Sequence, residues 1–464
     1  MSQGRARTDT VDRRVAARAA KRPRRRLLAY VGLGLGVVVL SVAGLILIFG
    51  RTILNAYGKG KLERAFAAAH PSWSLRIGEL DYAVRADRWV ARVVTLSATN
   101  ATFKVGQISL TGLRWAPLLR GTVALADIAQ GRLEASDLEV EFPQGDYGIR
   151  CAQLRASLPE SELVAEGAEL WPLGGDEAFF AAHAFRMTRF HAVVPECRVS
   201  GLAYTELLQG TSYRARSVHF SRPSLEVLVN RDKPLKPFVK SPLMVHEALA
   251  SIRRPLQVDR LSVTNGRLRS CVRMHAGADP AVLTFGAVSA SVEGIANQGE
   301  PTATIQVRAQ GDLMDAGTLK VLMAIPITPP QFSLHYSGSL GAMDLSRLNA
   351  FLDIAQHVRV KSGHAQEAAF EIEVLAGQAR GQVRAIYHDL GVTVLDAQTG
   401  TEQGFDNRVT SFLANLLKVR NANTPDAAGG MKEGKVNYTR PAEDGFLEFV
   451  WSALWTGVRD VITH

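Results

Sequence analysis

The sequence predicts a mainly β fold: an N-terminal transmembrane helix, then an elongated, curled, antiparallel β-sheet body with a few short helices and a C-terminal amphipathic helix. Three observations support this. One long uncharged run lies near the N-terminus, short segments that alternate apolar and polar residues fill most of the rest, and helical periodicity is scarce among them. With 464 residues and 47% hydrophobic content, the chain can bury a sizeable core.

The chain begins with a basic tail, residues 1–26. This tail holds ten Lys and Arg residues and two Asp residues, a net charge of +8, and the formal charge of the whole chain is +10. Only +2 is left for the remainder. Because the body lacks the concentrated positive charge that follows phosphates, we expect no nucleic-acid partner.

Residues 27–50 carry no charged side chain and, at about 1.5 Å per residue, are long enough to cross a hydrocarbon layer of about 30 Å. We interpret them as an uncleaved transmembrane anchor. A cleaved signal peptide is the alternative, but its apolar region would span only about 7–15 residues. Because the basic tail precedes the anchor, the positive-inside rule predicts a single-pass protein of the bacterial inner membrane, with its N-terminus in the cytoplasm and its body in the periplasm.

Weak internal repetition suggests that the body holds two related β units. Residues 96–103 resemble residues 261–268, and residues 103–110 resemble residues 283–290. In the second match the apolar phase slips by one residue beside a glycine, as it does at a bulge. The predicted segments after the anchor are a juxtamembrane helix (51–69), a first β unit (70–235), a proline-rich connector with a short helix at 244–252 (236–255), a second β unit (256–400) and C-terminal helices with a cap (401–464).

The C-terminal segment is predicted to hold two helices, at residues 410–417 and 446–462, separated by a glycine-rich loop at residues 423–434. The last helix is amphipathic and carries Trp451 and Trp455. It lacks a polar face rich in Lys and Arg, so capping of the sheet is favoured over binding to a membrane surface.

These features together resemble the AsmA-like envelope proteins, in particular a branch that carries a domain of unknown function. The resemblance covers residues 27 to roughly 460. It includes Gly-Arg-Leu at 131–133 and 266–268, and the segment Gly338-Ser-Leu-Gly-Ala-Met-Asp-Leu-Ser-Arg-Leu-Asn-Ala-Phe-Leu352. It implies a groove-forming sheet and a role in outer-membrane biogenesis by moving phospholipid. The best-known bridging members are much longer, so a local lipid chaperone, a part of a larger assembly and a regulator without cargo all stay open.

An alternating strand has one apolar face, and curling the sheet would line a groove with those faces while the polar faces meet water. Acyl chains need such cover, because each CH₂ left in water costs about 0.8 kcal/mol. The alternative is that the same residues fill the closed core of a non-catalytic scaffold that binds other envelope proteins. The candidate lipid-groove residues are Ile305, Val307, Phe332, Leu334, Tyr336, Phe370, Ile372 and Val374.

No motif for catalysis, cofactor binding or metal binding is found, and we predict no enzyme and no cofactor; a hydrolase assembled by folding is the remote alternative. His246-Glu247 begins like a metalloprotease helix, but position 250 is alanine. The most reactive-looking neighbourhood holds His183, Arg186, Arg189, His191, Glu196 and Cys197. Of the three cysteines, Cys151 and Cys197 would be free to pair in an oxidising compartment, with Cys271 left over, but buried thiols are favoured.

Overall fold

The protein is described from a computed structural model. The residues it describes are Glu63, Ala67 and residues 73–83, 88–98, 101–112, 129–234, 243–300, 302–327, 331–396, 419–442 and 444–463. The basic tail, the predicted anchor at residues 27–50 and the predicted helix at residues 410–417 lie outside them. Of the predicted juxtamembrane helix they include only Glu63 and Ala67, and both are helical.

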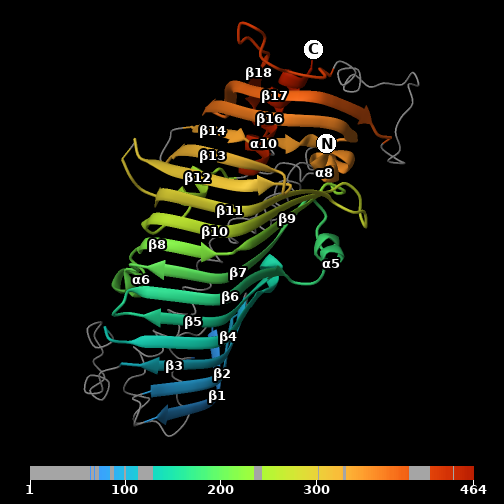
Figure 1. The fold of residues 1–464 in the computed structure, drawn as a ribbon. Coiled ribbons are helices and arrows are strands. Elements are labelled where there is room, and N and C mark those ends of the chain that lie inside the picture. The colour runs from blue at the N-terminus through green and yellow to red at the C-terminus, as the bar shows by residue number, and fades with distance from the viewer. Residues whose placement is uncertain are drawn as a thin grey trace, which may run out of the picture.

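One sheet of eighteen strands dominates the described chain (Figure 1). Its first nine strands are β1 (Trp73–Ala83), β2 (Arg88–Ala98), β3 (Ala101–Thr111), β4 (Arg132–Phe142), β5 (Tyr147–Ser157), β6 (Glu162–Pro172), β7 (Thr188–Ser200), β8 (Tyr213–Ser221) and β9 (Ser224–Asn230). The others are β10 (Leu256–Arg273), β11 (Ala281–Ala296), β12 (Thr304–Leu313), β13 (Gly317–Pro326), β14 (Leu334–Leu340), β15 (Met343–Asp344), β16 (Val358–Leu375), β17 (Gln378–Val394) and β18 (Glu433–Thr439). The mainly β prediction is confirmed.

The strands follow one another across the sheet nearly in chain order. Antiparallel pairs link each strand to the next from β1 to β7 and from β10 to β14, and then β14 to β16, β16 to β17 and β17 to β18. β7 pairs with both β8 and β9, which share one position in the sheet, and the short β15 pairs with β16.

The prediction of a purely antiparallel sheet is wrong at one joint. β10 runs parallel to β8 and β9. Parallel neighbours need a crossover that returns the chain to the starting end of the strand, and residues 231–255, with the helix α7 (Val245–Ala250), make this connection. At the connector predicted from sequence, strand pairing thus changes from antiparallel to parallel, and the same sheet continues on both sides of it.

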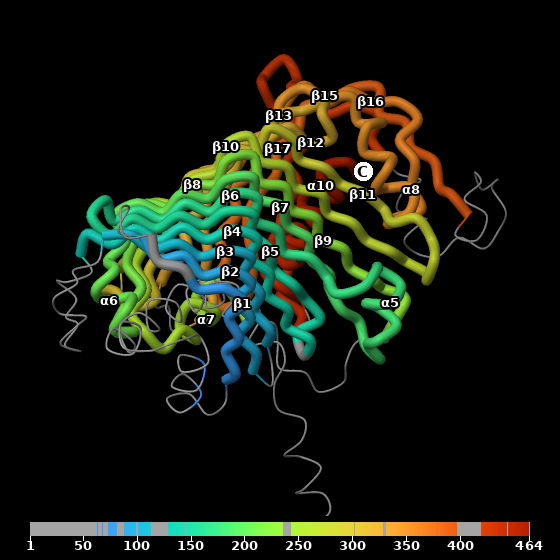
Figure 2. Tube along the Cα trace, turned by 90° about the horizontal axis from the view of Figure 1, so that it is seen from below, coloured from blue at the N-terminus to red at the C-terminus, as the bar shows by residue number. Residues whose placement is uncertain are grey.

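The other helices are α5 (Asp176–Ala181), α6 (Tyr204–Gln209), α8 (Asn349–Ala355) and α10 (Phe446–Ile462), with the 3-10 turns η3 (Pro143–Gly145) and η4 (Leu345–Leu348). α10 has the bounds predicted for the amphipathic helix. The loop predicted at residues 423–434 is two residues too long, because β18 begins at Glu433. Viewed from below (Figure 2), the strands bend over a common ridge, so the sheet is an arch.

A line of irregularities crosses the first six strands and bends them. The pairing skips one residue on each of these strands, and each skipped residue lies opposite the next on the neighbouring strand: Gly78, Val93, Gly106, Asp137, Ala152 and Gly167. Val93 and Asp137 have φ of 52° and 53°, and a Cβ at Gly78 or at Gly106 would lie 2.9 Å from the Cβ of the residue opposite. Glycine therefore makes room for the residue with positive φ that lies opposite it, and the apolar phase shifts by one residue there.

The internal repetition predicted from sequence is only partly matched. Residues 103–110 and 283–290 do lie within single strands, β3 and β11, and both strands are irregular beside Gly106 and Gly286. The first match is wrong, because residues 96–103 span the hairpin from β2 to β3 whereas residues 261–268 lie inside β10. An alternating pattern interrupted by Asn looks the same in a hairpin and in a bulged strand.

Candidate functional site

The most extensive feature of the sheet is an unbroken row of apolar residues across one face, which we call the inner face. Each member lies directly opposite the next on the neighbouring strand, and every strand except β9 and β15 contributes one residue. This first row is Leu80, Ala91, Ile108, Ala135, Leu154, Ala165, Cys197, Phe220, Val263, Ala290, Ala309, Val321, Gly338, Phe370, Val383 and Gly434.

A second row lies two residues further along each strand, on the same face, from β2 to β18. Its polar side-chain groups are the Tyr336 hydroxyl and the Trp89 indole N–H. Its members are Trp89, Leu110, Leu133, Ala156, Leu163, Val199, Val218, Leu261, Val292, Val307, Met323, Tyr336, Ile372, Gly381 and Val436. Two adjacent rows make a continuous apolar band that runs across the stacked strands.

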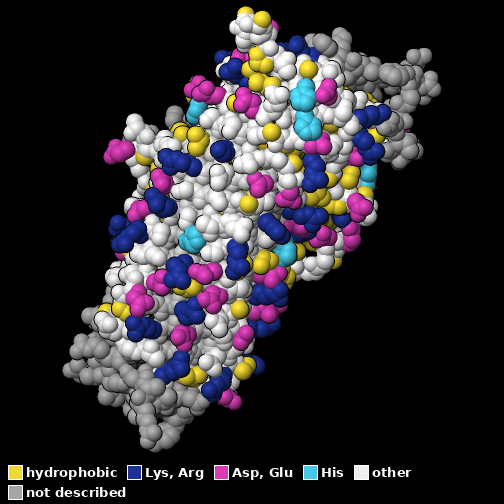
Figure 3. Space-filling view, in the orientation of Figure 1, with side chains coloured by type: hydrophobic (Ala, Val, Ile, Leu, Met, Phe, Trp, Pro, Cys, Tyr) yellow, Lys and Arg dark blue, Asp and Glu magenta, His cyan; other side chains and the backbone are white. Residues whose placement is uncertain are grey.

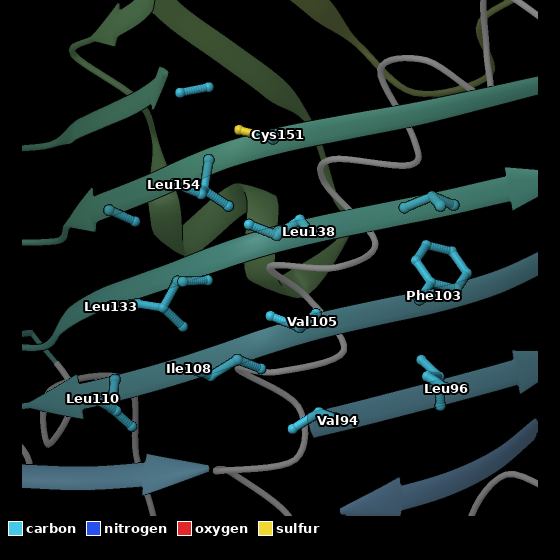
Figure 4. Packing of buried hydrophobic residues seen from close by; sticks show 14 of the residues in the cluster. Val94, Leu96, Phe103, Val105, Ile108, Leu110, Leu133, Leu138, Cys151 and Leu154 are labelled. Carbon is cyan, nitrogen blue, oxygen red and sulfur yellow. The ribbon is translucent and has the colours of Figure 1, made fainter. Parts of the chain in front are cut away.

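At the β1 end, the band belongs to a buried cluster on β1 to β6. Figure 4 shows its side chains, among them Phe103, Leu138 and Leu154, standing on one face of neighbouring strands. Leu154 is fully buried. Helix α6 contributes Tyr204, whose hydroxyl donates to the Glu162 carbonyl oxygen and fixes the helix to the end of β6.

At the β18 end, all eight candidate lipid-groove residues meet in one cluster. Ile305, Phe332, Leu334, Tyr336, Ile372 and Val374 are buried there, and Val307 and Phe370 are partly buried. Two helices pack on this cluster, α10 through Phe449 and Ala453, and α7 beside Met244. The sequence pattern identified residues that do come together, but at this end the chain's own helices cover them.

Close packing and one hydrogen bond hold α10 on the sheet. Phe449 is fully buried, with its ring centroid 5.5 Å from that of Phe332, and the Tyr336 hydroxyl donates to the Val450 carbonyl oxygen at 3.1 Å. A Cβ at Gly434 would lie 2.0 Å from the Gly457 carbonyl oxygen, so only glycine lets the helix approach β18 this closely.

Between the two buried clusters lies a part of the band that belongs to neither, which we call the middle stretch. It comprises the half-buried inner-face residues of β7, β8, β10, β11, β12 and β13. Five strand spacings of about 4.8 Å make it about 24 Å long. Its members are Val199, Val218, Phe220, Leu261, Val263, Ala290, Ala309 and Val321.

The outer face of the sheet is polar. In Figure 3, which views this face, positive and negative side chains are interspersed without a single-sign patch. Many are paired across neighbouring strands, and such exposed pairs each contribute about 0–1 kcal/mol. Examples are Lys104–Glu139 (3.1 Å), Arg198–Glu162 (2.7 Å) and Arg308–Glu293 (3.5 Å).

A more buried network on this face joins α5 to β7, β9 and β10. Arg189 is buried and contacts Asp176 at 2.9 Å and Glu226 at 2.7 Å, and Arg269 contacts Glu226 at 2.8 Å. Burial opposes ionisation of Glu226, but hydrogen bonds and charge from the two arginines outweigh it and hold the pKa of this carboxyl below its ordinary value. The network therefore stabilises the fold through an ionised Glu226.

The reactive-looking neighbourhood found in the sequence is not assembled into one site. His183 lies 3.2 Å from Asp146, whereas His191 lies 2.9 Å from Glu169 on the outer face. Cys197 belongs to the inner face, and burial raises the pKa of its thiol to about 11. Arg189 is in the α5 network, Glu196 pairs with Arg198 at 3.3 Å, and Arg186 donates its backbone N–H to Pro234.

All three cysteines are free thiols. A Cys151–Cys197 disulfide is excluded by the pairing, because the two residues lie on β5 and β7 with β6 between them. Two strand spacings separate them by about 10 Å, beyond the Cα separation of about 4.4–6.8 Å that a disulfide spans. Burial raises the pKa values of Cys151 and Cys271 as well.

His246, the start of the metalloprotease-like pattern, stacks on Phe332 with ring centroids 5.9 Å apart, and burial lowers its pKa. Across the described residues, no group of three or more His, Cys, Asp or Glu side chains is arranged to hold a metal ion. In the same part of the chain, no helix combines the length and hydropathy needed to cross a membrane.

Comparison with models of known protein families finds no match to this chain, and comparison with curated proteins finds none either. The features that sequence reasoning missed are the register of the two rows and the middle stretch. Their members are apolar residues in alternating segments like many others, and only pairing between distant strands aligns them.

Proposed function

We propose that this chain is a membrane-anchored periplasmic protein of the AsmA-like kind that binds phospholipid acyl chains along the inner face of its sheet and so supports outer-membrane biogenesis. The observation that carries the proposal is the unbroken apolar band formed by the two rows. A closed core needs apolar residues only where other elements cover them, yet this band continues through the half-buried middle stretch.

The dimensions and energetics of the middle stretch suit an acyl chain. Its length of about 24 Å exceeds the roughly 15 Å depth of one bilayer leaflet, half of a hydrocarbon core of about 30 Å. Transfer of about ten methylenes from water to this surface contributes on the order of 8 kcal/mol before the entropy of ordering the chain is subtracted. The polar outer face keeps the opposite side of the sheet in water.

The proposal is tested by a substitution that introduces a charged side chain into the middle stretch of the full-length protein. A protease site inserted after residue 50 releases the body into detergent-free buffer, and bound lipid is then measured by mass spectrometry. Leu261→Asp places a charge against the acyl chain, which costs several kcal/mol, so bound phospholipid falls at least about tenfold. The matched control is Ser262→Asp, the next residue of β10, which faces outward and leaves lipid binding unchanged.

A non-catalytic scaffold is the second candidate. One observation favours it: every predicted groove residue is buried or partly buried in the cluster on which α7 and α10 pack. This end of the inner face is therefore a closed core. A released wild-type body that is folded but free of lipid would support the scaffold and reject acyl-chain binding.

The proposed location is tested separately with a periplasmic reporter. Alkaline phosphatase fused to the C-terminus is active only after export, so the proposed topology predicts an active fusion. A green fluorescent protein fused at the same place and fluorescent in the cytoplasm would contradict it.

A further inference from the structure

A third apolar row crosses the inner face on the other side of the ridge. Its members lie directly opposite one another from Leu75 on β1 to Gly317 on β13, through β9 in place of β8. At the β1 end, Leu96 and Phe103 of this row share one buried cluster with Ile108 of the first row, so both rows face the same side of the sheet (Figure 4). On the central strands its members are Leu170, Ala192, Leu225, Leu268 and Phe285.

On β7, β9 and β10, this side of the inner face carries apolar residues that belong to none of the buried clusters of the described chain. We call them the opposite wall, because they lie across the ridge from the middle stretch. The surface of Leu225 is 37% exposed, and the other members are half-buried. The members are Ala192, Val194, Leu225, Val227 and Leu268.

The opposite wall and the middle stretch meet at the ridge. There β10 turns at Asn265 and β11 turns at Ala287, with φ of 52° and 45°. Along β10, the middle stretch ends at Val263 and the opposite wall begins at Leu268, five residues or at most about 17 Å further on. Gly266 lies between them and adds no side chain, so the apolar lining continues from one wall to the other.

The opposite wall has the length and the chemistry for an acyl chain of its own. From Leu170 on β6 to Phe285 on β11, four strand spacings of about 4.8 Å give about 19 Å, more than the roughly 15 Å depth of one bilayer leaflet. Both walls lie on interior strands, whose backbone groups are paired with their neighbours. A peptide on such a surface would bury its own N–H and C=O groups unpaired, whereas an acyl chain has none.

We propose that the arch binds a two-chain phospholipid, with one acyl chain along the middle stretch and the second along the opposite wall. The inference rests on the proposed binding of acyl chains, and it adds the number of chains and the place of the second. A lipid with one chain covers one wall and leaves the other in water. Because the gain from burial grows with the apolar area covered, the two walls together favour a lipid with two chains.

The test is double photo-crosslinking of the full-length protein in cells. Benzophenone side chains at Leu225 and Leu261 of one molecule are expected to capture the same lipid. After digestion, mass spectrometry should find the β9 and β10 peptides joined through one two-chain phospholipid. The matched control combines Leu261 with Ser224, which is exposed, precedes Leu225 in β9 and faces outward; it should give no joined peptides.

A substitution on the opposite wall gives an independent measurement. Leu225→Asp places a charge beside the second acyl chain, and because Leu225 is partly exposed already, the fold tolerates it. The yield of lipid adducts at Leu261 is expected to fall about tenfold. Ser224→Asp, the matched control on the outer face, should leave that yield unchanged.

The outcomes separate this inference from the proposed function. Adducts at Leu261 with none at Leu225 would overturn the two-chain site and leave acyl-chain binding intact, whereas no lipid adduct at either position would reject acyl-chain binding itself. The two-chain site is also overturned if the captured lipid has a single chain, or if Leu225 forms crosslinks only to protein.

Discussion

Replacing Phe449 with alanine removes the side chain that fixes α10 to the inner face. Phe449 is fully buried, and its ring contacts those of Phe332 at 5.5 Å and Tyr438 at 5.8 Å between centroids. Truncation of a buried phenylalanine to alanine costs about 3–5 kcal/mol, and the loss of aromatic pairing adds to the transfer and cavity terms. We therefore expect Phe449→Ala to lower the free energy of unfolding by about 4 kcal/mol.

The assay is urea unfolding followed by tryptophan fluorescence, since Trp451 and Trp455 report on the same helix. Leu447→Ala is the control, because Leu447 is on α10 but 66% exposed, and it should change the free energy by at most about 0.5 kcal/mol. A loss below about 1 kcal/mol for Phe449→Ala would refute the packing of α10 on the sheet, and with it the closed end of the inner face.

Three further predictions follow from close packing, charge and thiol burial. Gly434→Ala should lower the melting temperature by several degrees because α10 can no longer approach β18, whereas Gly445→Ala, with open space at its Cβ, should not. The pKa of Glu226 is lower in the folded state than in the unfolded one, so its contribution to stability is present above the unfolded pKa and is lost as pH falls through the folded pKa. Glu226→Gln should therefore make the free energy of unfolding depend less on pH below about pH 4.5, as measured by circular dichroism. Mass spectrometry of the natively alkylated protein at pH 8 should show Cys151 and Cys197 reduced and slow to react, and a disulfide between them would contradict the assigned pairing.

Much of the fold could be predicted from sequence because local patterns decide it. Strand alternation in residues 303–309 and 370–374 reflects one buried and one exposed face, and the amphipathic period of residues 446–462 gave the bounds of α10. The parallel pairing of β10 with β8 and β9 could not be predicted, because it depends on the end of the sheet at which the crossover connection places the start of β10. The mismatch between residues 96–103 and 261–268 has a similar cause, since polar residues interrupt the apolar alternation in the same way in a hairpin and in a bulged strand.

The candidate site shows where local reasoning ends. Leu334 and Tyr336 alternate with polar neighbours, which predicts an apolar face but does not say what covers it. Here the cover is α10, a segment more than a hundred residues later in the chain. Leu261 and Val263 alternate in the same way and remain half-buried. The difference in burial between the two pairs comes from tertiary contacts, which the alternation of apolar and polar residues along one strand does not predict.

The most direct test of acyl-chain binding is photo-crosslinking along four consecutive positions of β10 in the full-length protein in cells. A benzophenone side chain is placed in turn at Leu261, Ser262, Val263 and Thr264, and adducts are identified by mass spectrometry. Because successive side chains of a strand face opposite sides, the account predicts phospholipid adducts at Leu261 and Val263 and none at Ser262 and Thr264. Absence of adducts at all four positions, or equal adducts at all four, would contradict it.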